Sequence, residues 1–132
     1  CLRDGCCRLE KLEEKNEEME YLINLGHFME CVVTTGIHAK DWFLTVSRLP
    51  LESDKAAVEQ LIQAAHRVLD AERENVLRAL PIVKRDSRLG WDPWMEYVCD
   101  RRRLDWKLKL LDYVQYTEMK QYRDCTEFKP KQ

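Results

Sequence analysis

Apolar residues recur at every third or fourth position along most of this chain, and residues that interrupt helices are scarce. The 132 residues include only four glycines and four prolines. The pattern is clearest over residues 58–80, where the apolar residues form one broad stripe and charged residues occupy the opposite face of the predicted helix. No segment shows the alternation of a strand. The spacing therefore predicts an all-α fold, an antiparallel bundle of three long helices plus one short helix.

The first predicted helix is very long. It covers residues 5–48, because no turn dipeptide interrupts the apolar run before Leu49 and Pro50. A kink near residues 34–36 is left open, and so is an alternative of two helices with a break between Gly26 and Gly36.

Capping residues and prolines set the bounds of the other predicted helices. Ser53 or Asp54 is expected to cap the second long helix, and Pro81 to end or kink it. A short helical turn is predicted over residues 93–98, and Asp100 is expected to cap the last long helix. These bounds give one helical domain over residues 1–132.

Composition excludes several classes of protein. The net charge of −2 argues against a nucleic-acid-binding domain, which is normally basic. No apolar stretch is long enough to span a membrane, and we expect no membrane partner. The six cysteines lack the paired spacing of a zinc site, so reduced thiols and a cytoplasmic location are expected. The chain begins with Cys1, and we therefore expect a fragment or C-terminal module of a larger protein.

The best candidate binding site is the connector before the last helix, where Gly90 suits a left-handed cap. Aromatic faces can stack on sugars, while carboxylates and arginine hydrogen-bond hydroxyl groups. The competing interpretation is structural, with Asp86 capping backbone amides and Arg88 holding a carboxylate such as Glu72 or Glu74. The candidate ligand-binding residues here are Asp86, Arg88, Trp91, Glu96 and Tyr97.

His38 is the second candidate, because it shares a helix face with Thr34 and Trp42. A lone histidine near a core is more often a hydrogen-bonded structural residue than a ligand. The chain has no Glu-x-x-His pair for a di-metal site, no G-x-S-x-G and no Gly-rich phosphate loop. We therefore expect no catalytic residue, no metal and no cofactor.

Several segments together resemble the C-terminal helical region of large bacterial glycoside-hydrolase-like proteins of the α-glucuronidase-like kind. The segments that carry this resemblance are residues 74–75, 81–83, 86–91, 93, 95–97 and 106–107, with Thr34, Thr35, His38, Lys40 and Trp42 before them. It implies an accessory region whose catalytic residues would lie in an upstream barrel. The family pattern has a small residue where Trp94 stands, which weakens the case for a shared ligand site there.

These observations favour a non-catalytic accessory module of a larger bacterial carbohydrate-active protein. Its partner would be another domain of the same protein or a second copy, and carbohydrate is a further candidate. One alternative is a freestanding interaction protein that self-associates through the apolar seam of residues 9–23, on which Asn16 fixes the register. The other alternative is a small ligand-binding bundle.

Overall fold

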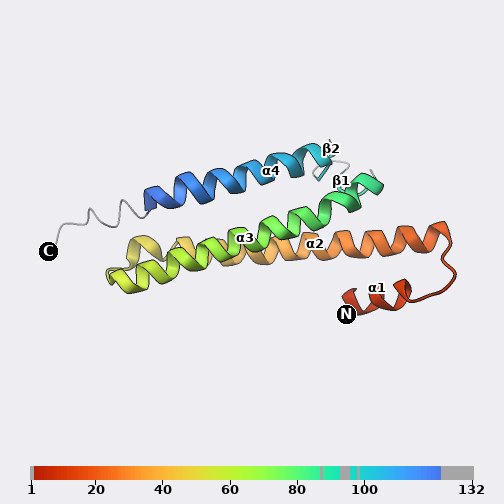
Figure 1. Cartoon of the computed structure of the whole chain (residues 1–132), viewed down its shortest axis with the longest axis horizontal. Helices are drawn as coiled ribbons and strands as arrows, with labels where there is room; N and C mark the ends of the chain where they lie inside the picture. The colour runs from red at the N-terminus through yellow and green to blue at the C-terminus, as the bar shows by residue number, and fades with distance from the viewer. Residues whose placement is uncertain (1, 87, 93–95, 98, 123–132) are drawn as a thin grey trace.

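The chain forms a helical bundle, as expected (Figure 1). The computed structural model describes residues 2–86, 88–92, 96–97 and 99–122. In chain order the elements are α1 (Leu2–Glu10), α2 (Glu17–Val46), the 3-10 turn η1 (Leu49–Leu51), α3 (Lys55–Arg85), strands β1 (Trp91–Asp92) and β2 (Glu96–Tyr97), α4 (Arg101–Tyr113) and the π-helical turn η2 (Val114–Glu118). The all-α class is confirmed, with three long helices and a short one.

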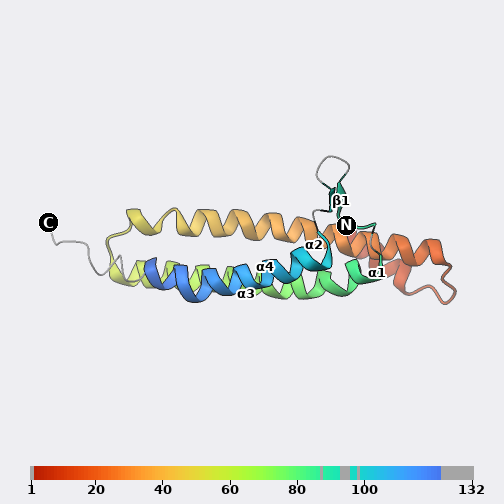
Figure 2. The same cartoon turned by 90° about the horizontal axis from the view of Figure 1, so that it is seen from above.

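The first long helix does not extend from residue 5 to residue 48. The chain leaves helix after Glu10, and α1 folds back along α2 (Figures 1 and 2). Asn16 is the N-cap of α2, because its Oδ1 accepts a hydrogen bond from the Met19 amide at 2.8 Å. Three glutamates in the first turn, Glu17, Glu18 and Glu20, complement the helix dipole. Asn16 therefore starts a helix rather than lying on a continuous seam.

We expect Asn16→Ala to lower the free energy of unfolding by about 1 kcal/mol, because the Met19 amide loses its acceptor. Asn16→Asp should retain most of the stability, since aspartate caps equally well. Urea denaturation followed by circular dichroism measures both effects. Glu13→Ala, between α1 and α2, is the control. An equal loss of unfolding free energy in Glu13→Ala and Asn16→Ala would contradict the role of Asn16 as the N-cap.

From Glu17 to Val46, α2 is uninterrupted, so the alternative of a break between Gly26 and Gly36 is wrong. Asp54 caps α3 through the amides of Ala56 and Ala57, as predicted. Pro81 does not end α3, which continues to Arg85. Val83 is buried in the core beyond the proline, and this packing favours continuation of the helix.

The predicted short helix over residues 93–98 is wrong where the structure describes that segment. Trp91 pairs with Tyr97 and Asp92 with Glu96, which makes a two-residue antiparallel ladder. Residues 93–95 and 98 lie outside the described residues. Gly90 precedes the ladder with a φ of 81°, so the predicted left-handed position is confirmed. Asp100 caps α4 through the Arg103 amide at 2.7 Å, also as predicted.

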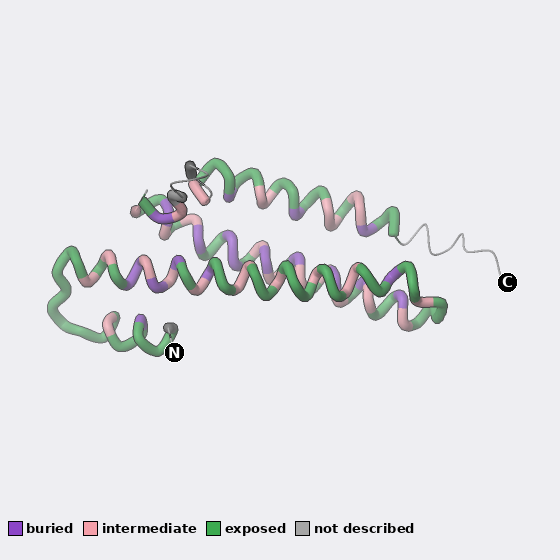
Figure 3. Tube along the Cα trace, turned by 180° about the vertical axis from the view of Figure 1, so that it is seen from behind, coloured by how far each residue is buried: buried purple, intermediate pink, exposed green. Residues whose placement is uncertain are grey.

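Of the long helices, α3 is the central one. α2 packs antiparallel along one side of α3, and α4 lies along another side (Figures 1 and 2). The largest fully buried side chains are Leu49, Ile62, Val76 and Met119. The buried residues of α2 all lie between Ile23 and Cys31, and the half of α2 nearest η1 is much more exposed (Figure 3). This uneven burial determines which surfaces remain open.

Candidate functional site

The connector that was expected to bind a ligand is pinned to the bundle by its own charged residues. Asp86 accepts hydrogen bonds from the Arg88 amide at 3.0 Å and from its guanidinium at 2.9 and 2.8 Å. The guanidinium also lies 4.5 Å from the ring centroid of Tyr21 on α2. Hydrogen bonding from Arg88 holds the pKa of Asp86 below its usual range. The prediction that Arg88 holds Glu72 or Glu74 is therefore wrong, because Asp86 takes that role.

The other candidates in this connector are described only by their backbone. Trp91, Glu96 and Tyr97 belong to the β1–β2 ladder, and their side chains lie outside the described part of the structure. Trp94 lies outside the described residues altogether. Ligand binding by the connector therefore stays a prediction.

His38 is not close to the connector candidates but belongs to a buried polar centre around Glu72. The Nδ1 atom of His38 lies 2.6 Å from Glu72 Oε2, and the Thr35 hydroxyl donates to Glu72 Oε1 at 2.7 Å. Lys107 of α4 forms an ion pair with the same carboxylate. Burial disfavours ionisation of Glu72, but the hydrogen bonds from Lys107, Thr35 and His38 outweigh it and hold the pKa of Glu72 below its ordinary value of 4.5.

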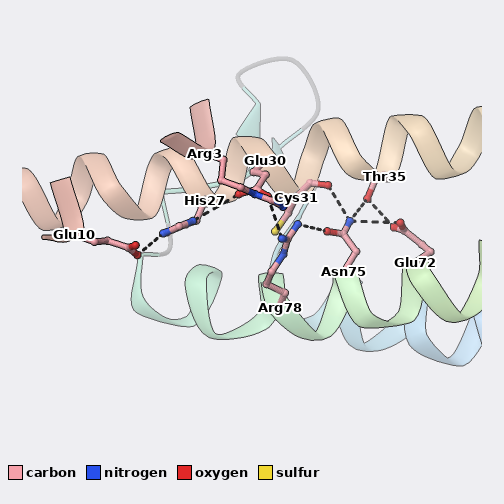
Figure 4. A network of polar contacts seen from close by, with 9 residues as sticks. All are labelled: Arg3, Glu10, His27, Glu30, Cys31, Thr35, Glu72, Asn75 and Arg78. Carbon is pink, nitrogen blue, oxygen red and sulfur yellow. Dashed lines mark hydrogen bonds and ion pairs between the residues drawn. The ribbon is translucent and has the colours of Figure 1, made fainter. Parts of the chain in front are cut away.

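From this centre a line of polar contacts continues along the interface between α2 and α3 (Figure 4). The Asn75 amide donates to the Cys31 carbonyl at 2.9 Å and to the Thr35 hydroxyl at 3.1 Å. Arg78 then donates to Asn75 at 3.0 Å and to Glu30 at 3.2 Å. The contacts therefore fix the register of α2 against α3 over several turns.

Contacts from α1 complete this line of polar residues. Arg3 forms an ion pair with Glu30, and the Nε2 atom of His27 lies 2.8 Å from a carboxylate oxygen of Glu10 (Figure 4). Hydrogen bonding from Arg3 keeps the pKa of Glu30 below its usual range. These two contacts hold α1 against the side of α2.

The polar atoms of this centre are satisfied by the chain itself. Among the described residues, every buried side-chain nitrogen and oxygen has a hydrogen-bond partner, and no group of three metal-ligating side chains converges. Burial raises the pKa of the nearby Cys31 and Cys99 thiols, which keeps them in the weakly nucleophilic protonated form. The Glu72 carboxylate is occupied by donors of the chain itself.

An accessory module is expected to expose an apolar patch where its neighbour would sit, and the structure has a large apolar surface on α2, whose residues the sequence did not identify. Its side chains are exposed although they belong to a helix that is apolar on nearly all sides. The exposed apolar residues of α2 are Leu22, Met29, Val32, Val33, Ile37, Phe43 and Leu44. The signal was present, because a helix that is apolar all round needs neighbours all round. Within the described chain, only α1 and α3 make extensive contact with α2.

Next to this surface, a groove of about 610 Å³ runs between α2, α3 and α4. Val32 belongs both to the exposed surface and to the groove, so the two are continuous. Trp106 and Leu110 of α4 line the opposite side and are themselves exposed. The few polar side chains in the groove are Thr35, Asn75, Arg103 and Lys107.

In comparisons with known proteins, no family model, no curated protein and no solved structure matches this chain. The resemblance to the helical region of α-glucuronidase-like proteins therefore stays a prediction. None of the helices in the described part of the chain is both long and apolar enough to cross a membrane.

Proposed function

We propose that this chain is a non-catalytic helical module that binds another protein surface through the exposed apolar face of α2. One observation carries the proposal: apolar side chains cover this face, yet no element of the described chain packs on it. Met29 is 49% exposed, Val33 60% and Phe43 68%. Contiguous apolar surface of this kind on a small domain is characteristic of an interaction site.

The free energy available from covering the face supports association. From Leu22 to Leu44 the face extends about 33 Å along the helix. Each exposed aliphatic or aromatic side chain that becomes buried contributes about 25 cal/mol per Å² of apolar surface. The adjoining groove adds further apolar area at Trp106 and Leu110. A partner helix or an apolar domain surface that covered the face and the groove would be stabilised by the burial of apolar area in both.

The resemblance supplies the context of the proposal. It suggests that the module belongs to a larger bacterial carbohydrate-active protein, in which it packs against a catalytic domain or mediates dimerisation. Cys6, Cys7, Cys31 and Cys99 are all free thiols, and this supports the cytoplasm as the compartment of the module.

A small-molecule site is the second candidate, and the groove between α2 and α4 is the observation in its favour. Its lining is mainly apolar, with Lys107 already paired to Glu72. Sugar hydroxyls need polar partners, and a mainly apolar groove supplies few of them. The groove suits an apolar side chain of a protein partner better than a carbohydrate.

Site-specific photo-crosslinking tests the proposal. A benzophenone amino acid at position 33, on the exposed face, is expected to give a covalent adduct with another polypeptide in the source cells. The same group at position 63, exposed on α3, is the matched control. An adduct yield at position 33 no higher than at position 63 would show that the face has no protein partner.

A further inference from the structure

Gly36 lies in the middle of the exposed face, and the packing of the chain does not explain it. Glycine is a poor helix former, yet α2 is continuous through this position. A Cβ atom added at Gly36 would meet nothing within 4 Å. A small residue with open space above it allows another backbone to approach closely, and nothing within the described chain does so.

The residues around Gly36 are arranged symmetrically about Met29. Leu22 lies seven residues before Met29 and Gly36 seven residues after it. At 100° per residue, steps of seven in either direction return to within about 20° of the same line along the helix. If an identical helix ran antiparallel with Met29 at the centre, Leu22 of each copy would face Gly36 of the other.

The charges on the face follow the same symmetry. Glu18 lies eleven residues before Met29 and Lys40 eleven residues after it, and both are exposed. Steps of eleven also return to within about 20° of the same line. In the antiparallel arrangement Glu18 would face Lys40 of the second helix at each end, so opposite charges would meet twice.

From this self-complementarity we infer that a second copy of the chain covers the face from Glu18 to Lys40, with its α2 antiparallel and a two-fold axis near Met29. The inference rests on the proposed function, because it names the partner of the same face. A two-fold interface brings the same patch of both copies together, so each residue of the patch needs a complementary residue within the same patch. Leu22 is complementary to Gly36 in size, and Glu18 is complementary to Lys40 in charge. A different partner would not require these pairs to be equidistant from one residue.

The neighbours of α2 leave this approach open. α1 is held on the side of Glu30 and His27, and α3 on the side of Cys31, Thr35 and His38. Arg88 of the connector lies over Tyr21, which is about 80° around the helix from Met29. Met29, Gly36 and Lys40 all lie on the remaining side and are exposed. The second helix therefore reaches the face without displacing either neighbour.

Sedimentation velocity over a range of concentrations tests the inference, with charge reversal as the decisive comparison. Wild type is expected to dimerise. Glu18→Lys and Lys40→Glu are each expected to weaken the dimer about tenfold, because both symmetry-related pairs change from attraction to repulsion. The double variant E18K/K40E should restore dimerisation, since the charges are exchanged. Arg67→Glu, on the exposed side of α3, is the control and should leave the dimer unchanged.

Gly36→Leu adds a steric test that does not depend on charge. The open space above Gly36 means that the variant should fold with unchanged helix content by circular dichroism, while dimerisation is abolished. A wild-type chain that stays monomeric at high concentration would overturn the inference, as would a dimer that none of these variants weakens. If photo-crosslinking at position 33 then captures a different polypeptide, the proposed function stands and only the identity of the partner is wrong.

Discussion

Replacing Glu72 with alanine is expected to lower the free energy of unfolding by about 3–5 kcal/mol, because it breaks a buried ion pair by removing one partner. The Glu72 side chain is only 7% exposed, and its carboxylate is held by donors from two other helices, Thr35 and His38 of α2 and Lys107 of α4. Its removal leaves the Lys107 ammonium and the Thr35 hydroxyl without their main acceptor in a half-buried setting.

Lys107→Met is the matched comparison. Glu72 keeps its hydrogen bonds from Thr35 and His38 in that variant, and the methionine side chain can lie along the groove. Its loss should therefore be clearly smaller than that of Glu72→Ala. Equal losses would mean that the ion pair, rather than the whole set of donors, holds the carboxylate. Urea denaturation at neutral pH measures both.

The dependence of stability on acid pH gives a second test of the role of Glu72. The pKa of Glu72 is lower in the folded chain than its ordinary value of 4.5, so the unfolded chain binds more protons at acidic pH. The contribution of Glu72 is thus fully present above about pH 4.5 and is lost as the pH falls through the folded pKa. Glu72→Gln should flatten the acid side of the stability curve, and an unchanged slope would contradict the assignment.

The helices themselves could be predicted from the sequence, because their signals are local. The apolar spacing of α3 and the caps at Asp54 and Asp100 depend only on residues within a few positions of each other. The break before α2 was missed because Asn16 fits two roles, a polar residue on an apolar seam or an N-cap. Only the packing of α1 back onto α2 distinguishes the two.

The buried polar centre could not be predicted, because it joins residues far apart in the chain. Thr35 and His38 lie on α2, whereas Glu72 lies on α3, more than thirty residues later in the chain. Their contact depends on the register of α2 against α3, and Lys107 joins them only when α4 packs on α3. Side-chain spacing within one helix carries no information on such register.

The exposed face of α2 was present in the sequence but could not be distinguished from core. Met29, Val33 and Phe43 continue the apolar pattern of the buried residues before them. Whether they are covered depends on where α4 lies, and α4 packs on α3 instead of covering α2. The connector between α3 and α4 determines where α4 packs. Its backbone geometry therefore decides whether the face of α2 stays exposed and where the groove lies.

Gly90→Ala is therefore expected to have the second-largest effect, a loss of about 2–4 kcal/mol of unfolding free energy. Gly90 has a φ of 81°, a conformation that costs an L-residue about 1–2 kcal/mol. An added Cβ would also lie 2.8 Å from the Cys99 Cβ and 3.0 Å from the Cys99 carbonyl oxygen, so the backbone just before α4 would have to move.

Gly5→Ala is the matched control, because Gly5 lies within α1 and an added Cβ there meets nothing within 4 Å. That substitution should be neutral or slightly stabilising, since alanine favours helix. Urea denaturation of both variants measures the difference. The displaced start of α4 should also expose Trp106 differently, which a shift in tryptophan fluorescence would report. If Gly90→Ala were as stable as Gly5→Ala, the left-handed turn would not be what places α4 beside the groove.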